Sequence, residues 1–198
     1  MILPEDARIR RRRHASTVRF PSHRLLPVAA ALFAAALLAT AAPARTGHAG
    51  SGAAQLTRLE SGVFEQINFI RSQHGLTDLH LSVRLSEAAT QHSREMGLDG
   101  YFEHSSVDGS PFWKRIARYY PSGGRHYWSV GENLLWSSPS VVPSAALQLW
   151  MNSPEHRANI LNPRWREIGV SAVHFAHAHG VYKGRAVTIV TTDFGVRS

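Results

Sequence analysis

The sequence contains no cysteine among its 198 residues. This absence excludes a disulfide framework, a thiolate zinc site, a cysteine nucleophile and a lipid anchor on cysteine. Charged residues make up only 18 % of the chain, and hydrophobic residues make up 43 %. Such a composition excludes a disordered tail and a multi-pass membrane protein. The length allows one ordinary domain with a hydrophobic core.

The net charge of +8 is concentrated near the N-terminus. Residues 1–44 carry seven arginines against two acids, whereas residues 45–198 carry 15 basic and 12 acidic residues. An apolar run over residues 28–42 follows the basic stretch and closes on Ala42-Pro43-Ala44, a small-x-small cleavage pattern. We therefore predict a secretion signal over residues 1–44 and a secreted, extracellular protein. Cleavage after Ala49 and an uncleaved N-terminal anchor are the alternatives.

The rest of the chain divides into a linker and one domain. Residues 45–55 are rich in Gly, Ala and Ser and have no apolar period, which predicts a flexible linker. Residues 56–198 are predicted to form the folded domain. The small positive charge that remains there gives no ground for nucleic-acid binding. Membrane contact is predicted only through the signal segment, and the oligomeric state stays open.

Apolar spacing predicts an α+β domain. Leu59, Val63 and Ile67 recur at helical spacing, Gly75 is the expected stop, and Ser82 is the expected start of a second helix. Further helices are predicted over residues 112–119, 145–151 and after Ser153-Pro154. Residues 168–175 and 186–194 predict two strands of an antiparallel hairpin, and residues 129–136 a strand or an extended loop.

The candidate chemistry lies in histidines and one acid, because histidine and carboxylate are the metal ligands left to a chain without cysteine. His104 follows two aromatic residues, Glu132 lies at the edge of an apolar stretch, and His156 lies in the first turn of a helix. The helix dipole there disfavours protonation of His156, so its imidazole is expected to stay neutral. The intervals of 28 and 24 residues fit no local metal motif. A shared site and separate hydrogen-bonded histidines both remain open on spacing alone.

Several stretches of the chain match the pattern of one known family. The longest runs from Trp150 to Leu161 and reads WMNSPEHRANIL. The others follow the family's order over roughly residues 62–195: Asn68-x-x-Arg71, Gly75-Leu76, Tyr101-Phe102-Glu103-His104, Asp108-Gly109, Arg115, Gly131-Glu132-Asn133, Ile168-Gly169-Val170 and Asp193-Phe194-Gly195. On these stretches the chain resembles the CAP superfamily (cysteine-rich secretory proteins, antigen 5 and pathogenesis-related proteins), in its bacterial secreted branch.

The resemblance implies a three-layer α-β-α sandwich with a small antiparallel sheet and an open cleft. Eukaryotic members carry two His and two Glu there, and His104, Glu132 and His156 match three of these positions. The fourth position is Ser153, where the eukaryotic pattern has Glu. Glu155 and Asp108 are nearby acids, and the resemblance assigns neither to the fourth position. The cleft residues expected here are His104, Glu132, His156, His92, Asp108 and Ser153.

The predicted function is that of a secreted ligand-binding module for a lipid, a sterol or a cell-envelope fragment. His104 and His156 are the candidate ligands for Zn²⁺, in a two-histidine site that leaves positions for water or an anionic ligand. Glu132 is the candidate catalytic residue, and it could ligate the metal, orient a histidine or act as a base. The alternatives are a metal-assisted hydrolase of an extracellular or cell-wall substrate and a surface interaction domain with a vestigial cleft.

Overall fold

The computed structural model describes residues 56–198. The predicted secretion signal and linker lie outside the described residues. The helices are α1 (Arg58–Gln73), α2 (Val83–Asp99), α3 (Phe112–Tyr119), α4 (Pro143–Met151) and α5 (Pro154–Ile160), with a short 3-10 turn η1 (Gly180–Tyr182). The strands are β1 (His80–Leu81), β2 (Trp128–Ser137), β3 (Glu167–Ala178) and β4 (Arg185–Arg197). No helix within residues 56–198 is both long and apolar enough to cross a membrane.

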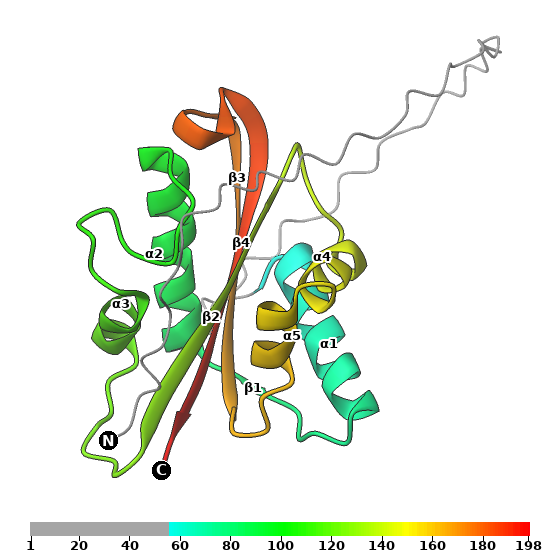
Figure 1. The fold of residues 1–198 in the computed structure, drawn as a ribbon, viewed down its shortest axis with the longest axis vertical. Helices are drawn as coiled ribbons and strands as arrows, with labels where there is room; N and C mark the ends of the chain where they lie inside the picture. The colour runs from blue at the N-terminus through cyan, green and yellow to red at the C-terminus, as the bar shows by residue number, and fades with distance from the viewer. Residues whose placement is uncertain (1–55) are drawn as a thin grey trace, which may run out of the picture. The chain divides into compact units, whose positions relative to one another are not determined.

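The helices cover both faces of one sheet, which confirms the α+β class and the three layers (Figure 1). Helices α2 and α3 lie on one face, and α1, α4 and α5 lie on the other. The strand order is β1-β3-β4-β2, with β3-β4 and β4-β2 antiparallel. The sheet is mixed rather than wholly antiparallel, because the two-residue strand β1 pairs with β3 in parallel. Two residues carry too little pattern to signal a strand in the sequence.

The helix boundaries follow local chemistry. Thr57 and Glu60 form a capping box at the start of α1, in which each side chain bonds the other residue's backbone N–H. Gly100 ends α2 in the left-handed conformation, at φ 72°. Ser82 and Ser153 stand at the predicted N-cap positions, but neither side chain caps its helix. At α5, Pro154 at the first position has no N–H, so the first turn has one unpaired donor fewer.

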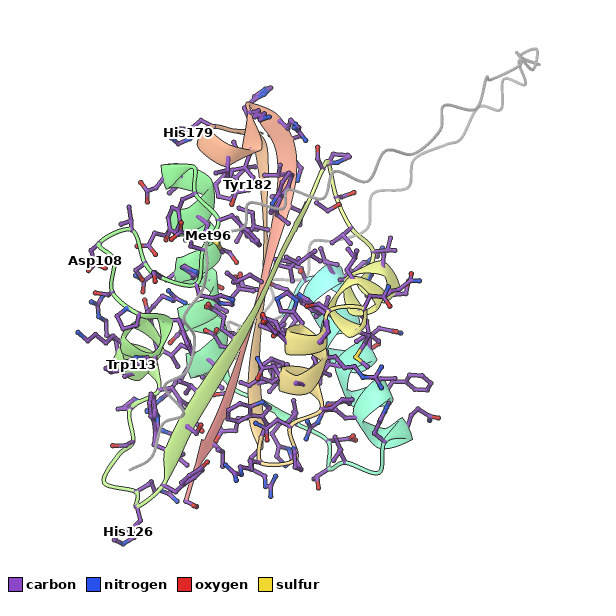
Figure 2. All side chains as sticks on the ribbon, viewed as in Figure 1. Met96, Asp108, Trp113, His126, His179 and Tyr182 are labelled. Atoms are coloured by element: carbon purple, nitrogen blue, oxygen red, sulfur yellow. The ribbon has the colours of Figure 1, made fainter. Side chains whose placement is uncertain are left out.

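A hydrophobic core fills the space on each side of the sheet. The cluster beneath α1, α4 and α5 includes Ile67, Trp150 and Phe194, all buried. On the opposite face, Met96, Ile189 and Tyr182 form a second cluster, toward the end of the β3-β4 hairpin (Figure 2). Because both faces of the sheet are covered, β4 is buried along most of its length.

Gly169 on β3 sets how closely α2 approaches the sheet. A Cβ atom at this position would lie 2.1 Å from the backbone carbon of Leu85 and 2.2 Å from the backbone nitrogen of Ser86. Backbone atoms cannot move aside singly, so Gly169→Ala must displace the helix. We expect a loss of about 1–3 kcal/mol in the free energy of unfolding, measured by urea denaturation. A variant as stable as the wild type would contradict this close approach.

Candidate functional site

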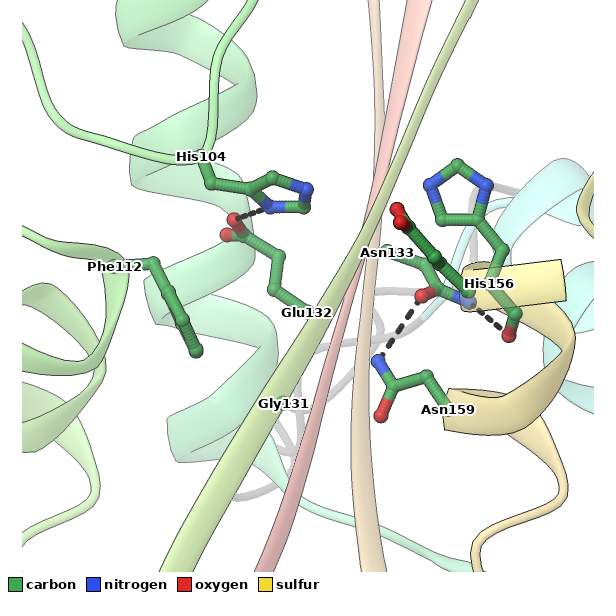
Figure 3. Close-up of a pocket in the computed structure, with 8 residues that line it drawn as sticks. His104, Phe112, Gly131, Glu132, Asn133, His156 and Asn159 are labelled. Carbon is green, nitrogen blue, oxygen red and sulfur yellow. Dashed lines mark hydrogen bonds and ion pairs between the residues drawn. The ribbon is translucent and has the colours of Figure 1, made fainter. Parts of the chain in front are cut away.

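A cleft of about 360 Å³ runs along β2, the edge strand of the sheet (Figure 3). Its floor is the segment Gly131-Glu132-Asn133. Successive residues of a strand point to opposite faces, so the Glu132 side chain joins the layer of α2 and α3, and the Asn133 side chain joins that of α5. The residues that line the cleft are His104, Phe112, Gly131, Glu132, Asn133, Glu155, His156 and Asn159.

The first wall is built around the carboxylate of Glu132. Its side chain is fully buried, and both of its oxygens accept hydrogen bonds: Oε1 from Nδ1 of His104 at 2.8 Å, and Oε2 from a guanidinium nitrogen of Arg115. The whole residue is 6 % exposed although its side chain is 0 % exposed. What Glu132 presents to the cleft is therefore its main chain.

Arg115 joins this wall to the loop that carries His104. The guanidinium is buried on the inner face of α3, where it contacts Glu132. Its second terminal nitrogen donates to the Ser106 hydroxyl at 3.1 Å and to the His104 carbonyl at 3.3 Å. One buried cation thus holds both the carboxylate and the backbone of the histidine that the carboxylate binds.

The second wall places His156 through a chain of amide contacts. The Asn133 side chain donates to the His156 carbonyl at 3.1 Å and accepts from the Asn159 amide at 3.0 Å. The indole N–H of Trp165 donates to both oxygens of Asn159, at 3.0 and 3.1 Å. A Cβ at Gly131 would lie 2.6 Å from the Asn159 amide oxygen and 2.8 Å from a ring carbon of Trp165, so a larger residue must displace these side chains. These bonds fix the start of α5 against the sheet edge.

The two imidazoles approach each other across β2 (Figure 3). The carboxylate of Glu132 only accepts, so Nδ1 of His104 carries the proton, and its Nε2 is the ring nitrogen left for a ligand. Burial lowers the pKa of His156, and repulsion between the two imidazoles when both are protonated lowers it further, against an opposing effect of Glu155. A neutral His156 imidazole can bind a metal or accept a hydrogen bond at neutral pH.

The structure brings His104, Glu132 and His156 together and leaves the other expected cleft residues apart. His92 is fully buried beneath Glu132, with its Nε2 donating to the Glu103 carbonyl at 2.9 Å. Asp108 lies in an exposed loop, where it accepts from the Ser110 backbone at 2.8 Å (Figure 2). Ser153 stands at the N-cap of α5 and does not line the cleft.

The expected cleft set lacked Arg115, which contacts Glu132, and five residues that line the cleft: Phe112, Gly131, Asn133, Glu155 and Asn159. Arg115 carried a usable signal, because it is a charged residue on the face of α3 that also carries the buried Ile116. A charge in such a place is rare unless it is paired. Asn133 and Asn159 lie in matching stretches, but no local pattern indicates that their side chains bond each other.

A metal ion in this cleft would have two protein ligands at most. No group of three or more His, Asp or Glu residues in the described part of the chain is arranged to hold a metal. Glu132 has both oxygens engaged within the protein. Nε2 of His104 and the neutral ring of His156 are donors suited to Zn²⁺, and the remaining positions would fall to water or a bound ligand.

Comparisons with known proteins agree with this architecture. A family model described as the cysteine-rich secretory protein family (CAP) matches residues 64–190. The uncharacterized protein YkwD of Bacillus subtilis is 34 % identical over 154 residues, which cover 77 % of this chain and 57 % of that protein. The chain therefore spans little more than half the length of this relative.

Solved structures show the same likeness. An extracellular protein of Bacillus anthracis that contains an SCP domain is 31 % identical, with a TM-score of 0.51, over 75 % of this chain and 45 % of that chain. An outer surface protein of Borrelia burgdorferi shares the fold at 19 % identity and a TM-score of 0.51, over 69 % of this chain and 90 % of that chain. From the fold, the cleft and the family model together, this chain belongs to the cysteine-rich secretory protein (CAP) family.

Proposed function

We propose that the cleft is a binding site for a polar ligand of the cell envelope, with Zn²⁺ held reversibly by His104 and His156. One observation carries the proposal: two imidazoles reach from opposite walls, and one of them is held by Glu132 with Nε2 left for a ligand. A two-histidine site leaves coordination positions in which an anionic or hydroxyl group of a ligand could displace water.

The residues that line the cleft offer polar contacts to a ligand. Five of the eight contribute polar side chains, whereas Phe112 is apolar, Gly131 has no side chain and Glu132 contributes its main chain. A few placed polar groups fix the orientation of a ligand in a pocket. A cell-envelope fragment with hydroxyl, amide or carboxylate groups is therefore the ligand class that this lining supports.

Of the three roles considered for Glu132, orientation of His104 agrees best with the contacts. A general base must come within hydrogen-bond reach of its substrate or of a bound water. The Glu132 side chain is fully buried and bonds His104 and Arg115 instead. A carboxylate that holds a metal-binding histidine is a common second partner in metal sites. This contact supports ligand binding over metal-assisted hydrolysis.

Calorimetric titration of the metal-free protein with ZnCl₂ tests the metal site. We expect one reversible binding event in the wild type, weakened by at least about tenfold, or ~1.4 kcal/mol, in both His104→Ala and His156→Ala. His126→Ala is the matched control, because His126 is exposed on a turn away from the cleft (Figure 2). Equal zinc affinity in all four proteins would contradict the proposal.

We further propose that the chain acts outside the cytosol. The basic stretch and apolar run within residues 1–44 support export. The similar protein of Bacillus anthracis is described as extracellular, and that of Borrelia burgdorferi as an outer surface protein. A cell-envelope fragment is a ligand that such a location would supply.

A further inference from the structure

Asp193 places a second carboxyl group directly beneath the cleft. It lies on β4 opposite Glu132 on β2, and directly paired residues of antiparallel strands point to the same face. Asp193 is fully buried, and no donor within residues 56–198 bonds either of its oxygens. The side chain that it faces is another carboxyl group. A buried charge without a partner is costly, so this arrangement requires an explanation.

The charges around Asp193 do not balance if both carboxyl groups are ionised. Arg115 from α3 is the one permanent cation in this buried cluster. His92 from α2 lies 4.0 Å from Glu132 and 3.3 Å from Glu95. Burial has the largest effect and lowers the pKa of His92, against opposing effects of Glu132, Glu95 and the Glu103 carbonyl, which leaves the neutral form favoured. With His92 neutral, the charges of this cluster balance only if one of the two carboxyl groups holds a proton.

The hydrogen bonds decide which carboxyl group is neutral. Both oxygens of Glu132 accept from nitrogen donors, and such donors favour the ionised form. Asp193 receives no such bond, while its burial favours the neutral form. A neutral carboxylic acid also has an O–H to donate, and the Glu132 carboxylate is the acceptor across the strand pair.

We propose that Asp193 is a positioning residue: as a neutral acid, it donates a hydrogen bond to Glu132 and thereby fixes the Glu132 carboxylate against Nδ1 of His104. The proton of Nδ1 then stays in place, and Nε2 of His104 keeps its lone pair for a ligand. In this way Asp193, which does not line the cleft, sets the tautomer of His104, which does.

The electrostatics of the cluster agree with this geometry. Burial raises the pKa of Asp193 well above its ordinary range, and the negative charge of Glu132 raises that pKa further. The positive charge of Arg115 opposes these effects. The competing arrangement is an ionised Asp193 that interacts with the guanidinium of Arg115, whose Nε atom is buried and has no bonded partner within residues 56–198.

The protonation state can be measured in the wild-type protein without metal. We would label the aspartate side-chain carboxyl carbons with ¹³C and record their NMR signals at neutral pH. The Asp193 signal, assigned by its loss in Asp193→Asn, is expected at the chemical shift of a protonated acid and to stay there between about pH 5 and 7.5. A signal at the shift of an ionised carboxylate at neutral pH would overturn the proposal.

The positioning role is tested by the tautomer of His104, read from its ring ¹⁵N shifts in metal-free protein. Asp193→Asn keeps a neutral donor, so we expect the Nδ1–H form to persist. Asp193→Leu removes the donor, so a mixture of tautomers is expected. Asp99→Asn is the control for removal of an exposed acid on α2. An unchanged His104 in a folded Asp193→Leu would overturn the role.

These measurements stand apart from the zinc experiment. Both NMR experiments use metal-free protein. Asp193 can therefore prove to be ionised in a protein that binds zinc, or neutral in a protein that does not bind zinc. Only the expected decrease in zinc affinity for Asp193→Leu, by about tenfold, rests on the proposed function.

Discussion

Arg115→Met is expected to lower the free energy of unfolding by about 3–5 kcal/mol, because it leaves the Glu132 carboxylate buried without its cation. The side chains of Arg115 and Glu132 are 1 % and 0 % exposed, so water cannot replace the lost charge. The substitution also removes the bonds from the guanidinium to the His104 carbonyl and the Ser106 hydroxyl. Methionine keeps much of the volume of the arginine stem. The decrease in the free energy of unfolding therefore reflects the missing charge more than missing packing contacts.

Urea denaturation followed by circular dichroism measures this loss. Arg118→Met is the matched control, since Arg118 lies on the same helix with its side chain exposed, and it should change stability by less than about 0.5 kcal/mol. The double variant Arg115→Met/Glu132→Gln should recover part of the loss, because the amide buries no charge. A loss in Arg115→Met no greater than in the control would show that Glu132 needs no cation.

Trp150→Ala is expected to cost about 3–5 kcal/mol of unfolding free energy, as large-to-small changes in a core do. Trp150 is 1 % exposed within the cluster beneath α1, α4 and α5. Its indole N–H donates to the Leu134 carbonyl at 3.0 Å, on the unpaired edge of β2. The substitution opens a cavity and also leaves that carbonyl without its donor.

A three-variant series separates the two contributions. Trp150→Phe keeps a ring in the core and removes the donor, so a smaller loss of about 1–3 kcal/mol is expected. Leu149→Ala is the control, because Leu149 is next to Trp150 in the chain and is 48 % exposed. This substitution should lower the free energy of unfolding by less than about 0.5 kcal/mol. Thermal or urea unfolding gives all three values. Equal losses in Trp150→Ala and Leu149→Ala would contradict the packing described for α4.

The sequence predicted most elements of the fold because their signals are local. Helical apolar spacing, Ser82 and Ser153-Pro154 placed α1, α2 and α5 close to where they lie. The prediction for residues 129–136 remained open between a strand and a loop. The strand forms because β2 pairs with β4 from Trp128 to Ser137, a contact between segments about 60 residues apart along the chain.

The candidate site was harder to predict from the sequence than the fold, because its residues lie on different layers. Spacing alone could not show that His104, Glu132 and His156 meet, and only the family pattern indicated it. They converge because β2 sends Glu132 to one face and Asn133 to the other. Asp193 was recognised only as part of the family pattern, because no local signal shows that β4 is an inner strand on which Asp193 lies opposite Glu132.

The position of the cleft on an edge strand has a mechanical consequence. Its two walls belong to opposite outer layers, and between the histidines the floor is a single strand. The gap between His104 and His156 therefore varies with any rocking of the α2-α3 layer against the α1-α4-α5 layer. A ligand or ion that bonds both imidazoles would act as a cross-link between these layers. Binding of such a ligand in the cleft would then restrict the motion of the two helical layers relative to each other.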